Sequence, residues 1–282
     1  MTSASSKPSS PRRAKPRPES SADDDAPNPK GDRIAKVLAR AGVCSRREAE
    51  RWIADGRVSV DNVVLTTPAF LVTEKSLIVV DGKPIRDTEP TRVWRYHKPI
   101  GLLTTHNDPQ GRQTVFDTLP PALGRVISVG RLDYNSEGLL LLTNDGGLAR
   151  KLEMPSTAWT RRYRVRVHGR PTEEELAKLA RGITIDGVRY GSIEAALDRQ
   201  QGSNAWVTLA LNEGKNREIR KVMEYLGWPV TRLIRVAYGP FQLGNLEEGR
   251  VEEVTGRVLT EQLGVAPRES VARQNANRRR PS

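Results

Sequence analysis

The stretch GRLDYNSEGLLLLTNDG, residues 130–146, decides the fold that this sequence predicts. It places an acid, an arginine and two glycines directly before four consecutive leucines. A short apolar run bounded by turn residues is typical of a strand that is buried on both faces. We therefore expect a buried strand over residues 139–143, with the carboxylate of Asp133 displayed just before the N-terminal end of that strand.

Length and charge limit the class of protein. The chain has 282 residues, which is enough for one large or two modest domains, and the pattern favours two. Its formal net charge at pH 7 is +12, and its isoelectric point is near 10.1. The basic excess runs through the body of the chain as well as through both ends. This distribution favours a polyanionic partner, and nucleic acid is the first candidate.

Cysteine, histidine and apolar patterns exclude several other classes. Cys44 is the single cysteine, so no intramolecular disulfide can form. The three histidines lie too far apart in the sequence to form a zinc-type cluster. No apolar segment approaches the roughly 20 residues that span a bilayer, and no secretory signal opens the chain. We expect a cytoplasmic protein without a membrane segment or a structural metal.

The two ends of the chain are poor in apolar residues. Residues 1–31 are rich in Ser, Pro, Lys, Arg and Asp, and residues 265–282 are similar and basic. Such segments cannot bury enough apolar surface to offset the loss of chain entropy. We expect two disordered tails, and a solubilising role for the basic tail is as well supported as a contact with RNA.

A small module is predicted over residues 32–87. Asp32 is placed to cap a first helix, and Gly42 is suited to end it in the left-handed conformation. Ser45 and Glu48 form a capping-box pattern that starts a second helix. Short apolar runs separated by turn residues then predict a small sheet with strands over 57–60, 63–65 and 77–80.

The two helices of this module carry a concentration of cations. Helical geometry gathers most of these cations at the junction of the helices, where they can bind phosphate. The alternative interpretation is that they form a solvated charged face without a ligand. The module resembles the ribosomal-protein-S4-like RNA-binding domain, notably over residues 42–49 and 56–58. That resemblance implies binding to structured RNA through Arg46, Arg47 and Arg57.

A second domain is predicted over residues 92–260. Its first segment, 93–105, alternates apolar and polar residues and then turns sharply at Pro99 and Gly101. Strands in succession with unevenly spaced helices favour an α+β fold whose sheet is mixed and largely antiparallel. Further strands are predicted over 125–129, 139–143, 163–167, 192–197, 205–211 and 233–236, and helices over 147–153, 172–181 and 216–226.

Three places in this domain have residues suited to chemistry. The first is Asp133, for which an ordinary turn aspartate is the alternative. The second is Tyr163, an aromatic residue among arginines as base stacking requires, although a half-exposed strand tyrosine is the commoner explanation. The third is the glycine turn and basic helix start at residues 213–221, where a solvated helix face is the default.

Together these places resemble the ribosomal-RNA pseudouridine synthases that join an S4-like domain to a catalytic domain. The motif at 130–133, with the glycine and leucines that follow it, is similar to the central signature of that family. The resemblance runs from Asp32 to Leu259. Other matching segments are the lysine-proline-glycine motif at 98–101, the tyrosine motif at 162–165 and the closing motifs at 216–221 and 233–240.

The resemblance implies that the protein isomerises uridine to pseudouridine within folded RNA and needs no external cofactor. Asp133 is then the catalytic residue, either as a nucleophile or as the base that removes a ribose proton. An adjacent cation favours the ionised form of a carboxyl group, and Arg220 is the matching residue, with Arg217 and Lys221 as neighbours. Tyr163 lies against the uracil in this scheme and helps to remove a proton.

The resemblance also implies contacts to ribosomal RNA. The uridine must be extruded from its helix, and phosphate contacts help to offset the cost, with Lys98, Arg131 and Arg235 as candidates. Residues 107–112 are most similar to the branch that acts on large-subunit ribosomal RNA, while small-subunit RNA and transfer RNA stay open. We expect a monomer.

Two other functions stay open at this point. A glycosidase can use an aspartate at a sugar carbon, with Glu137 as the partner of Asp133. That chemistry requires two carboxylates across a sugar cleft and does not explain the basic module. A non-catalytic RNA-binding or ribosome-assembly factor is the stronger rival, but all the matching reactive residues are present, which favours the enzyme.

Overall fold

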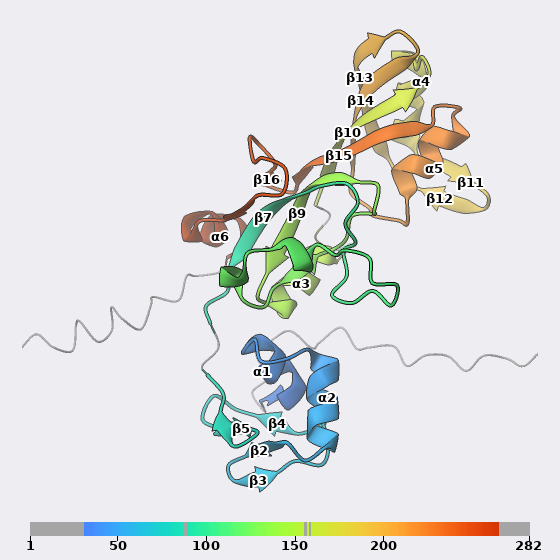
Figure 1. Ribbon diagram of the computed structural model, residues 1–282. Coiled ribbons are helices and arrows are strands. Elements are labelled where there is room, and N and C mark those ends of the chain that lie inside the picture. The colour runs from blue at the N-terminus through green and yellow to red at the C-terminus, as the bar shows by residue number, and fades with distance from the viewer. Residues whose placement is uncertain (1–30, 87–88, 155–156, 158, 265–282) are drawn as a thin grey trace, which may run out of the picture.

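The computed structural model describes residues 31–86, 89–154, 157 and 159–264. Figure 1 shows a small N-terminal unit with two helices and, above it, a larger unit built on a long twisted sheet. The α+β fold class and the mixed, mostly antiparallel sheet are confirmed. The expected tails fall almost entirely outside the described residues. No helix in the described part of the chain is long and apolar enough to cross a membrane.

The N-terminal unit packs two helices against small sheets around one core. Ile34, Leu38, Ile53 and Val58 in this core have no exposed surface. Cys44 is buried among them, and burial raises the pKa of its thiol to about 11, so it acts as a small packed residue. The elements are α1 (Ile34–Arg40), α2 (Arg46–Ala54), a sheet in the order β3 (Val63–Val64), β2 (Val58–Val60), β5 (Ile78–Val80) and β6 (Lys83–Pro84), and a pair of β1 (Asp32–Arg33) with β4 (Leu71–Val72).

The ends of the two helices follow the sequence pattern with one exception. Ser45 and Glu48 form the expected capping box, with hydrogen bonds of 3.1 and 2.8 Å between side chains and backbone N–H groups. Gly42 follows α1 with a φ of 75°. The expected cap at Asp32 is wrong. Asp32 is extended in β1, its carboxylate pairs with Lys36 at 3.0 Å, and the cap position falls one residue later.

The large unit is built on one sheet of nine strands. Every pairing is antiparallel except that between β15 and β9, which run parallel. All seven residues of β9 are buried, which confirms the strand expected from the leucine run. The main path is β13 (Ile193–Gln201), β14 (Asn204–Leu211), β10 (Arg161–His168), β15 (Val230–Tyr238), β9 (Glu137–Thr143), β7 (Val93–Lys98) and β17 (Val251–Glu253), with β8 (Ile127–Val129) beside β9, β16 (Phe241–Gln242) beside β15, and a separate hairpin of β11 (Ile183–Ile185) and β12 (Val188–Tyr190).

The large unit has two halves that meet where β9 pairs with β15 (Figure 1). The loop that carries Asp133 precedes β9 and therefore lies at the seam between the halves. One core lies around β10, β13 and β14, a second lies on one face of β9, and a third lies on the opposite face of β9. The first core is closed by α4 (Glu173–Ala177) and α5 (Glu218–Tyr225), and the second by α3 (Gly146–Glu153) and α6 (Gly256–Leu263).

Candidate active site

The loop that carries Asp133 is fixed by hydrogen bonds from several segments. At its start, the N–H of Gly130 donates to Oε1 of Glu153 in α3 at 2.6 Å. Within the loop, the N–H of Ser136 donates to the carbonyl of Asp133 at 3.0 Å and closes a turn. The hydroxyl of Thr104 donates to the carbonyl of the residue before the aspartate at 2.9 Å. The aspartate is therefore presented by a well-anchored loop.

Lys98 lies inside the protein and supports the end of this loop. Its Nζ donates to the carbonyl oxygens of Ser136 at 2.8 Å and Pro99 at 2.9 Å, and the residue has no exposed surface. Burial lowers the pKa of Lys98 to about 8, against the opposing influence of the Asp133 and Glu137 carboxylates. The ammonium group of Lys98 faces backbone carbonyls in this structure, and the expected contact with a phosphate stays a prediction.

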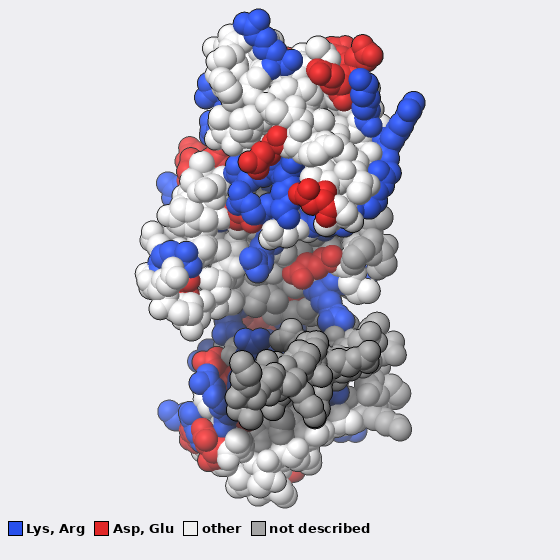
Figure 2. Space-filling model, turned by 90° about the vertical axis from the view of Figure 1, so that its right-hand side faces the viewer, with Lys and Arg blue, Asp and Glu red and all other residues white. Residues whose placement is uncertain are grey.

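A cavity of about 400 Å³ opens beside the aspartate loop. Asp133, Tyr163 and Arg220 all line it, so the structure brings together the three residues that the sequence predicts to be catalytic. They come from the loop before β9, from β10 and from α5. Charged side chains form much of the cavity wall. Figure 2 shows Lys and Arg side chains gathered in the middle of one face of the upper unit, with acidic side chains beside them.

Arg217, directly before α5, makes the ion pair with Asp133. Its Nη1 lies 3.8 Å from Oδ2 of the aspartate, whose side chain is 33% exposed. Arg220 instead donates to the carbonyl oxygens of Asn135 at 2.7 Å and Val230 at 3.3 Å. Burial lowers the pKa of Arg220, and so does Arg217, while Asp133 opposes them. Arg220 thus ties the aspartate loop to β15, and its direct catalytic role stays a prediction.

Tyr163 projects from β10 at the wall of the same cavity. Its backbone pairs with Leu209 of β14 and Arg235 of β15, and its side chain is half-buried. A partly exposed ring at a cavity wall is suited to stacking on a base. Arg131 is exposed at this wall, and its contact with a phosphate stays a prediction.

The remaining arginines predicted to contact RNA differ in availability. Arg46 and Arg47 are exposed on α2. Arg57 is held by both oxygens of Asp81, at 2.8 and 2.6 Å, so its guanidinium is partly occupied. Arg235 is only 3% exposed, and its Nε donates to a backbone carbonyl of β9 at 2.7 Å. Arg235 nevertheless lines the cavity, and its Nη2 has no hydrogen-bond partner among the described residues, so its contact with a phosphate stays a prediction.

Three carboxyl groups to which the sequence assigned no role also line the cavity, those of Glu153, Glu213 and Glu218. Glu218 is 3% exposed, its Oε2 accepts the N–H of Lys215 at 3.0 Å, and its Oε1 has no donor among the described residues. Burial first, and then the neighbouring Glu213, raise the pKa of Glu218 from its ordinary 4.5 to about 8. Glu213 accepts the N–H of Gly191 at 2.6 Å. The raised pKa predicts that Glu213 and Glu218 share one proton. The sequence signal for this pair was the position of the two acids on either side of Gly214.

Glu137 does not supply a second carboxylate to the cavity. It is buried at the start of β9, it is not part of the cavity wall, and it forms an ion pair with Arg232. A glycosidase that uses Asp133 with Glu137 is therefore excluded. Within the ranges that the structure describes, no group of three or more His, Cys, Asp or Glu side chains is arranged to hold a metal ion.

A basic helical unit joined to a unit whose cavity displays the Asp133 carboxylate is compatible with an enzyme that acts on RNA. The chain matches the family model described as RNA pseudouridylate synthase over residues 92–225 and the S4 domain over residues 32–78. An uncharacterized RNA pseudouridine synthase of Rickettsia prowazekii is 47% identical over 231 residues, which are 82% of this chain and 97% of that protein. The chain belongs to the RNA pseudouridine synthases, which are isomerases.

Further relatives and a solved structure agree with this family. The ribosomal large subunit pseudouridine synthase B of Pseudomonas aeruginosa is 42% identical over 274 residues, covering 90% of this chain and 70% of that protein. The protein of the same name from Yersinia pestis is 44% identical over 219 residues, covering 76% of this chain and 69% of that protein. A crystal structure of pseudouridylate synthase has a TM-score of 0.55 and 25% identity, covering 79% of this chain and 96% of that one.

Proposed function

We propose that the protein isomerises uridine to pseudouridine in large-subunit ribosomal RNA, with Asp133 as the catalytic residue. The observation that carries this proposal is the place of the Asp133 carboxylate, which lines a cavity of about 400 Å³ and lies 3.8 Å from Arg217. The relatives that are named large-subunit synthases support the choice of RNA. Modification of ribosomal RNA also supports a cytoplasmic location, and we propose a monomer.

The target uridine has to leave its helix before Asp133 can reach it. Extrusion of a stacked base costs a few kcal/mol, which must be recovered in the protein. A cavity of about 400 Å³ is in the size range of sites that enclose one small ligand. Phosphate contacts by Arg46, Arg47 and Arg131 would supply the rest of the binding energy and make it sensitive to salt.

At the bound uridine, two routes are compatible with an aspartate at this position. Asp133 either attacks as a nucleophile or removes a ribose proton, and the N-glycosidic bond breaks. The uracil then turns within the cavity, and a carbon–carbon bond forms between the base and the ribose as the bond to Asp133 breaks or the proton returns to the ribose. The ring nitrogen released from the ribose takes up a proton. Tyr163 stacks on the base and helps to remove the proton from the newly bonded carbon. Arg217, at 3.8 Å, faces the negative charge that either route requires.

Asp133→Asn tests the catalytic assignment because it keeps the shape of the side chain and removes its charge. We expect no pseudouridine to form, while affinity for the RNA stays within about threefold of the wild type. Asp186→Asn, in the exposed turn between β11 and β12, is the matched control and keeps full activity. Turnover by Asp133→Asn would refute the mechanism and leave the family assignment intact.

Pseudouridine mapping of total RNA, with and without the intact gene, tests the choice of substrate. The expected result is the loss of pseudouridine at one or a few positions of large-subunit ribosomal RNA. A loss confined to small-subunit RNA or transfer RNA would move the proposed target there. No change in any RNA would favour the alternative of a non-catalytic RNA-binding or ribosome-assembly factor.

A further inference from the structure

A second cavity, of about 420 Å³, lies between the N-terminal unit and the large unit, which carries Asp133 and is called the catalytic unit from here on. One wall comes from α1 and α2, and the other from the β8 region and α3, which faces the N-terminal helices in Figure 1. A hollow with excess positive charge, built by both units, is suited to a polyanion. Its charged lining consists of Lys36, Arg40, Arg46, Arg125 and Arg150, with Asp145 and Glu153 as the acids.

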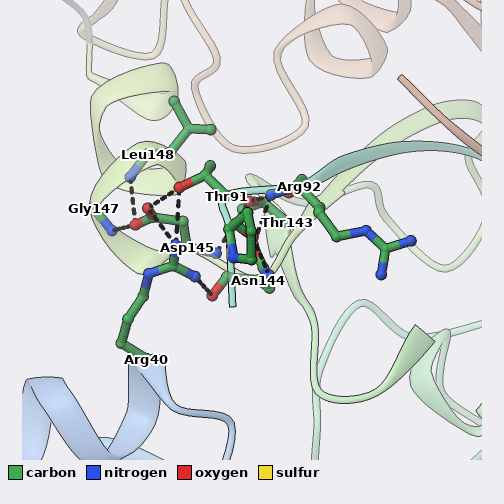
Figure 3. Close-up of polar contacts among 9 residues, drawn as sticks. Arg40, Thr91, Arg92, Thr143, Asn144, Asp145, Gly147 and Leu148 are labelled. Atoms are coloured by element: carbon green, nitrogen blue, oxygen red, sulfur yellow. Dashed lines mark hydrogen bonds and ion pairs between the residues drawn. The ribbon is translucent and has the colours of Figure 1, made fainter. Parts of the chain in front are cut away.

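Arg40 joins the two units beside this cavity (Figure 3). Its guanidinium donates to the Asn144 carbonyl at 3.1 Å and to the Thr91 hydroxyl at 2.9 Å, and it lies 3.4 Å from the Asp145 carboxylate. Asp145 also accepts the Thr91 hydroxyl at 2.8 Å and two N–H groups at the start of α3. Burial raises the pKa of Asp145, but Arg40, Thr91 and those N–H groups outweigh it and hold the pKa below its ordinary value.

The other arginines of the cleft have no such partner. Arg46, Arg125 and Arg150 make no hydrogen bond or ion pair within the described part of the chain, although each lines the same hollow. They come from α2, from the segment before β8 and from α3. The acids of the cleft are already engaged, since Asp145 binds Arg40 and caps α3 while Glu153 accepts the N–H of Gly130. Arg125 also lowers the pKa of Glu48 in α2, but Glu48 does not line the cleft, so the acids that do line it leave the charge of the three arginines unneutralised.

Two of the three arginines also reach across to the other unit. A Cβ placed on Gly146, at the start of α3, would lie 4.0 Å from Nη2 of Arg46, so this N-terminal side chain reaches the catalytic unit. A Cβ on Gly42, in the turn after α1, would lie 4.0 Å from Cβ of Arg125, so this catalytic-unit residue reaches the N-terminal unit. An anion that enters the cleft would meet guanidinium groups from both units at once.

We propose that this cleft binds the phosphodiester backbone of the RNA substrate, between Arg46 on the N-terminal side and Arg125 and Arg150 on the catalytic side. The proposal rests on the proposed function, because it takes the RNA of the synthase reaction as the ligand. Arginine forks match phosphate oxygens in geometry and keep their charge at any accessible pH. A phosphate held from both sides adds a second link to the joint at Arg40, so RNA binding and the orientation of the two units are coupled.

Binding of transcribed large-subunit ribosomal RNA by the full-length protein tests this site. The double variant Arg125→Gln, Arg150→Gln should bind at least tenfold more weakly, and the slope of log affinity against log salt concentration should fall by about 2. Lys151→Gln is the matched control, because it removes a neighbouring exposed cation of α3 that does not line the cleft. The double variant with lysine at both positions should restore the salt slope, which separates lost charge from misfolding.

The outcomes are distinct from those that test the catalytic proposal. Equal affinity and equal salt slope for the double glutamine variant and Lys151→Gln would overturn the cleft proposal, even if the wild type forms pseudouridine. The cleft proposal would also be overturned if the double glutamine variant lost affinity and the double lysine variant did not regain it. Absence of pseudouridine in the wild-type reaction would instead overturn the proposed function, whatever the binding data show.

Discussion

The backbone of Gly138 lies directly against the backbone of Arg235. A Cβ at Gly138 would sit 2.7 Å from the Arg235 nitrogen and 3.0 Å from its carbonyl carbon, and the φ of Gly138 is 103°. These two residues are partners in the parallel pairing of β9 with β15, which joins the two halves of the catalytic unit. Because Asp133 lies on the loop before β9, this close approach helps to set the position of the aspartate.

Gly138→Ala should therefore lower both stability and activity. The new methyl group meets backbone atoms that cannot move aside, and an alanine at this φ is strained, for a combined cost of roughly 2–4 kcal/mol. Chemical denaturation followed by tryptophan fluorescence measures the loss. Gly146→Ala is the control, since its nearest neighbour would be at 3.7 Å, an ordinary contact. A Gly138→Ala protein as stable as this control would show that β9 and β15 separate without cost.

Local patterns explain why much of the site could be predicted from the sequence. The glycines and the acid before the leucine run fix a turn and a buried strand, and β9 follows at Glu137–Thr143. The capping box of Ser45 and Glu48 depends only on residues three positions apart. The cap expected at Asp32 failed for the opposite reason, because pairing with Val72, far along the chain, keeps Asp32 in a strand.

Contacts between distant segments could not be predicted in this way. Arg40 and Asn144 are 104 residues apart, and nothing local to either residue marks the joint between the units. Lys98 looks like a phosphate ligand in the sequence, but the sheet buries it beside Ser136. Arg217 has a left-handed φ of 51°, which no helical pattern anticipates, and this backbone conformation accompanies its place beside Asp133.

Lys98→Met is expected to lower the turnover rate without changing the electrostatic part of RNA binding. Methionine fills similar space but cannot donate to the Ser136 and Pro99 carbonyls, so the aspartate loop loses an anchor. We expect kcat to fall by roughly tenfold or more. The salt slope of binding should stay as in the wild type, because Lys98 is buried and its ammonium group faces backbone carbonyls. A slope reduced by about 1 would show that Lys98 contacts a phosphate.

Lysine substitutions separate the roles of the two arginines near Asp133. Arg220→Lys keeps the charge but cannot reach the carbonyls of Asn135 and Val230 together, so we expect kcat to fall by about tenfold or more. Arg217→Lys keeps a cation near the aspartate, and we expect a loss of about threefold or less. Lys221→Arg, on the exposed side of α5, controls for general effects on the helix. Equal losses for both arginine variants would contradict this division.

The glutamate pair predicts how stability depends on pH. Burial and the neighbouring Glu213 raise the pKa of Glu218 from its ordinary 4.5 to about 8 in the folded protein. Its stabilising effect is therefore complete below pH 4.5 and is lost as the pH rises toward 8, because the unfolded chain ionises first. Above that range both carboxyl groups are charged, and their repulsion acts on the loop that holds Arg217 beside Asp133.

Glu218→Gln should remove this pH dependence, because the glutamine amide can donate to Glu213 at every pH. Thermal unfolding at pH 5, 7 and 9 is the measurement, and the wild type should lose more stability than the variant as the pH rises. Glu224→Gln, an exposed change on the same helix, should follow the wild-type curve. The titration of Lys98 has the opposite effect on stability, because its lowered pKa adds stability as the pH rises above about 8. This contribution is the same in the wild type and in both variants, so it does not affect the comparison. Parallel curves for the wild type and Glu218→Gln would mean that the two glutamates do not share a proton.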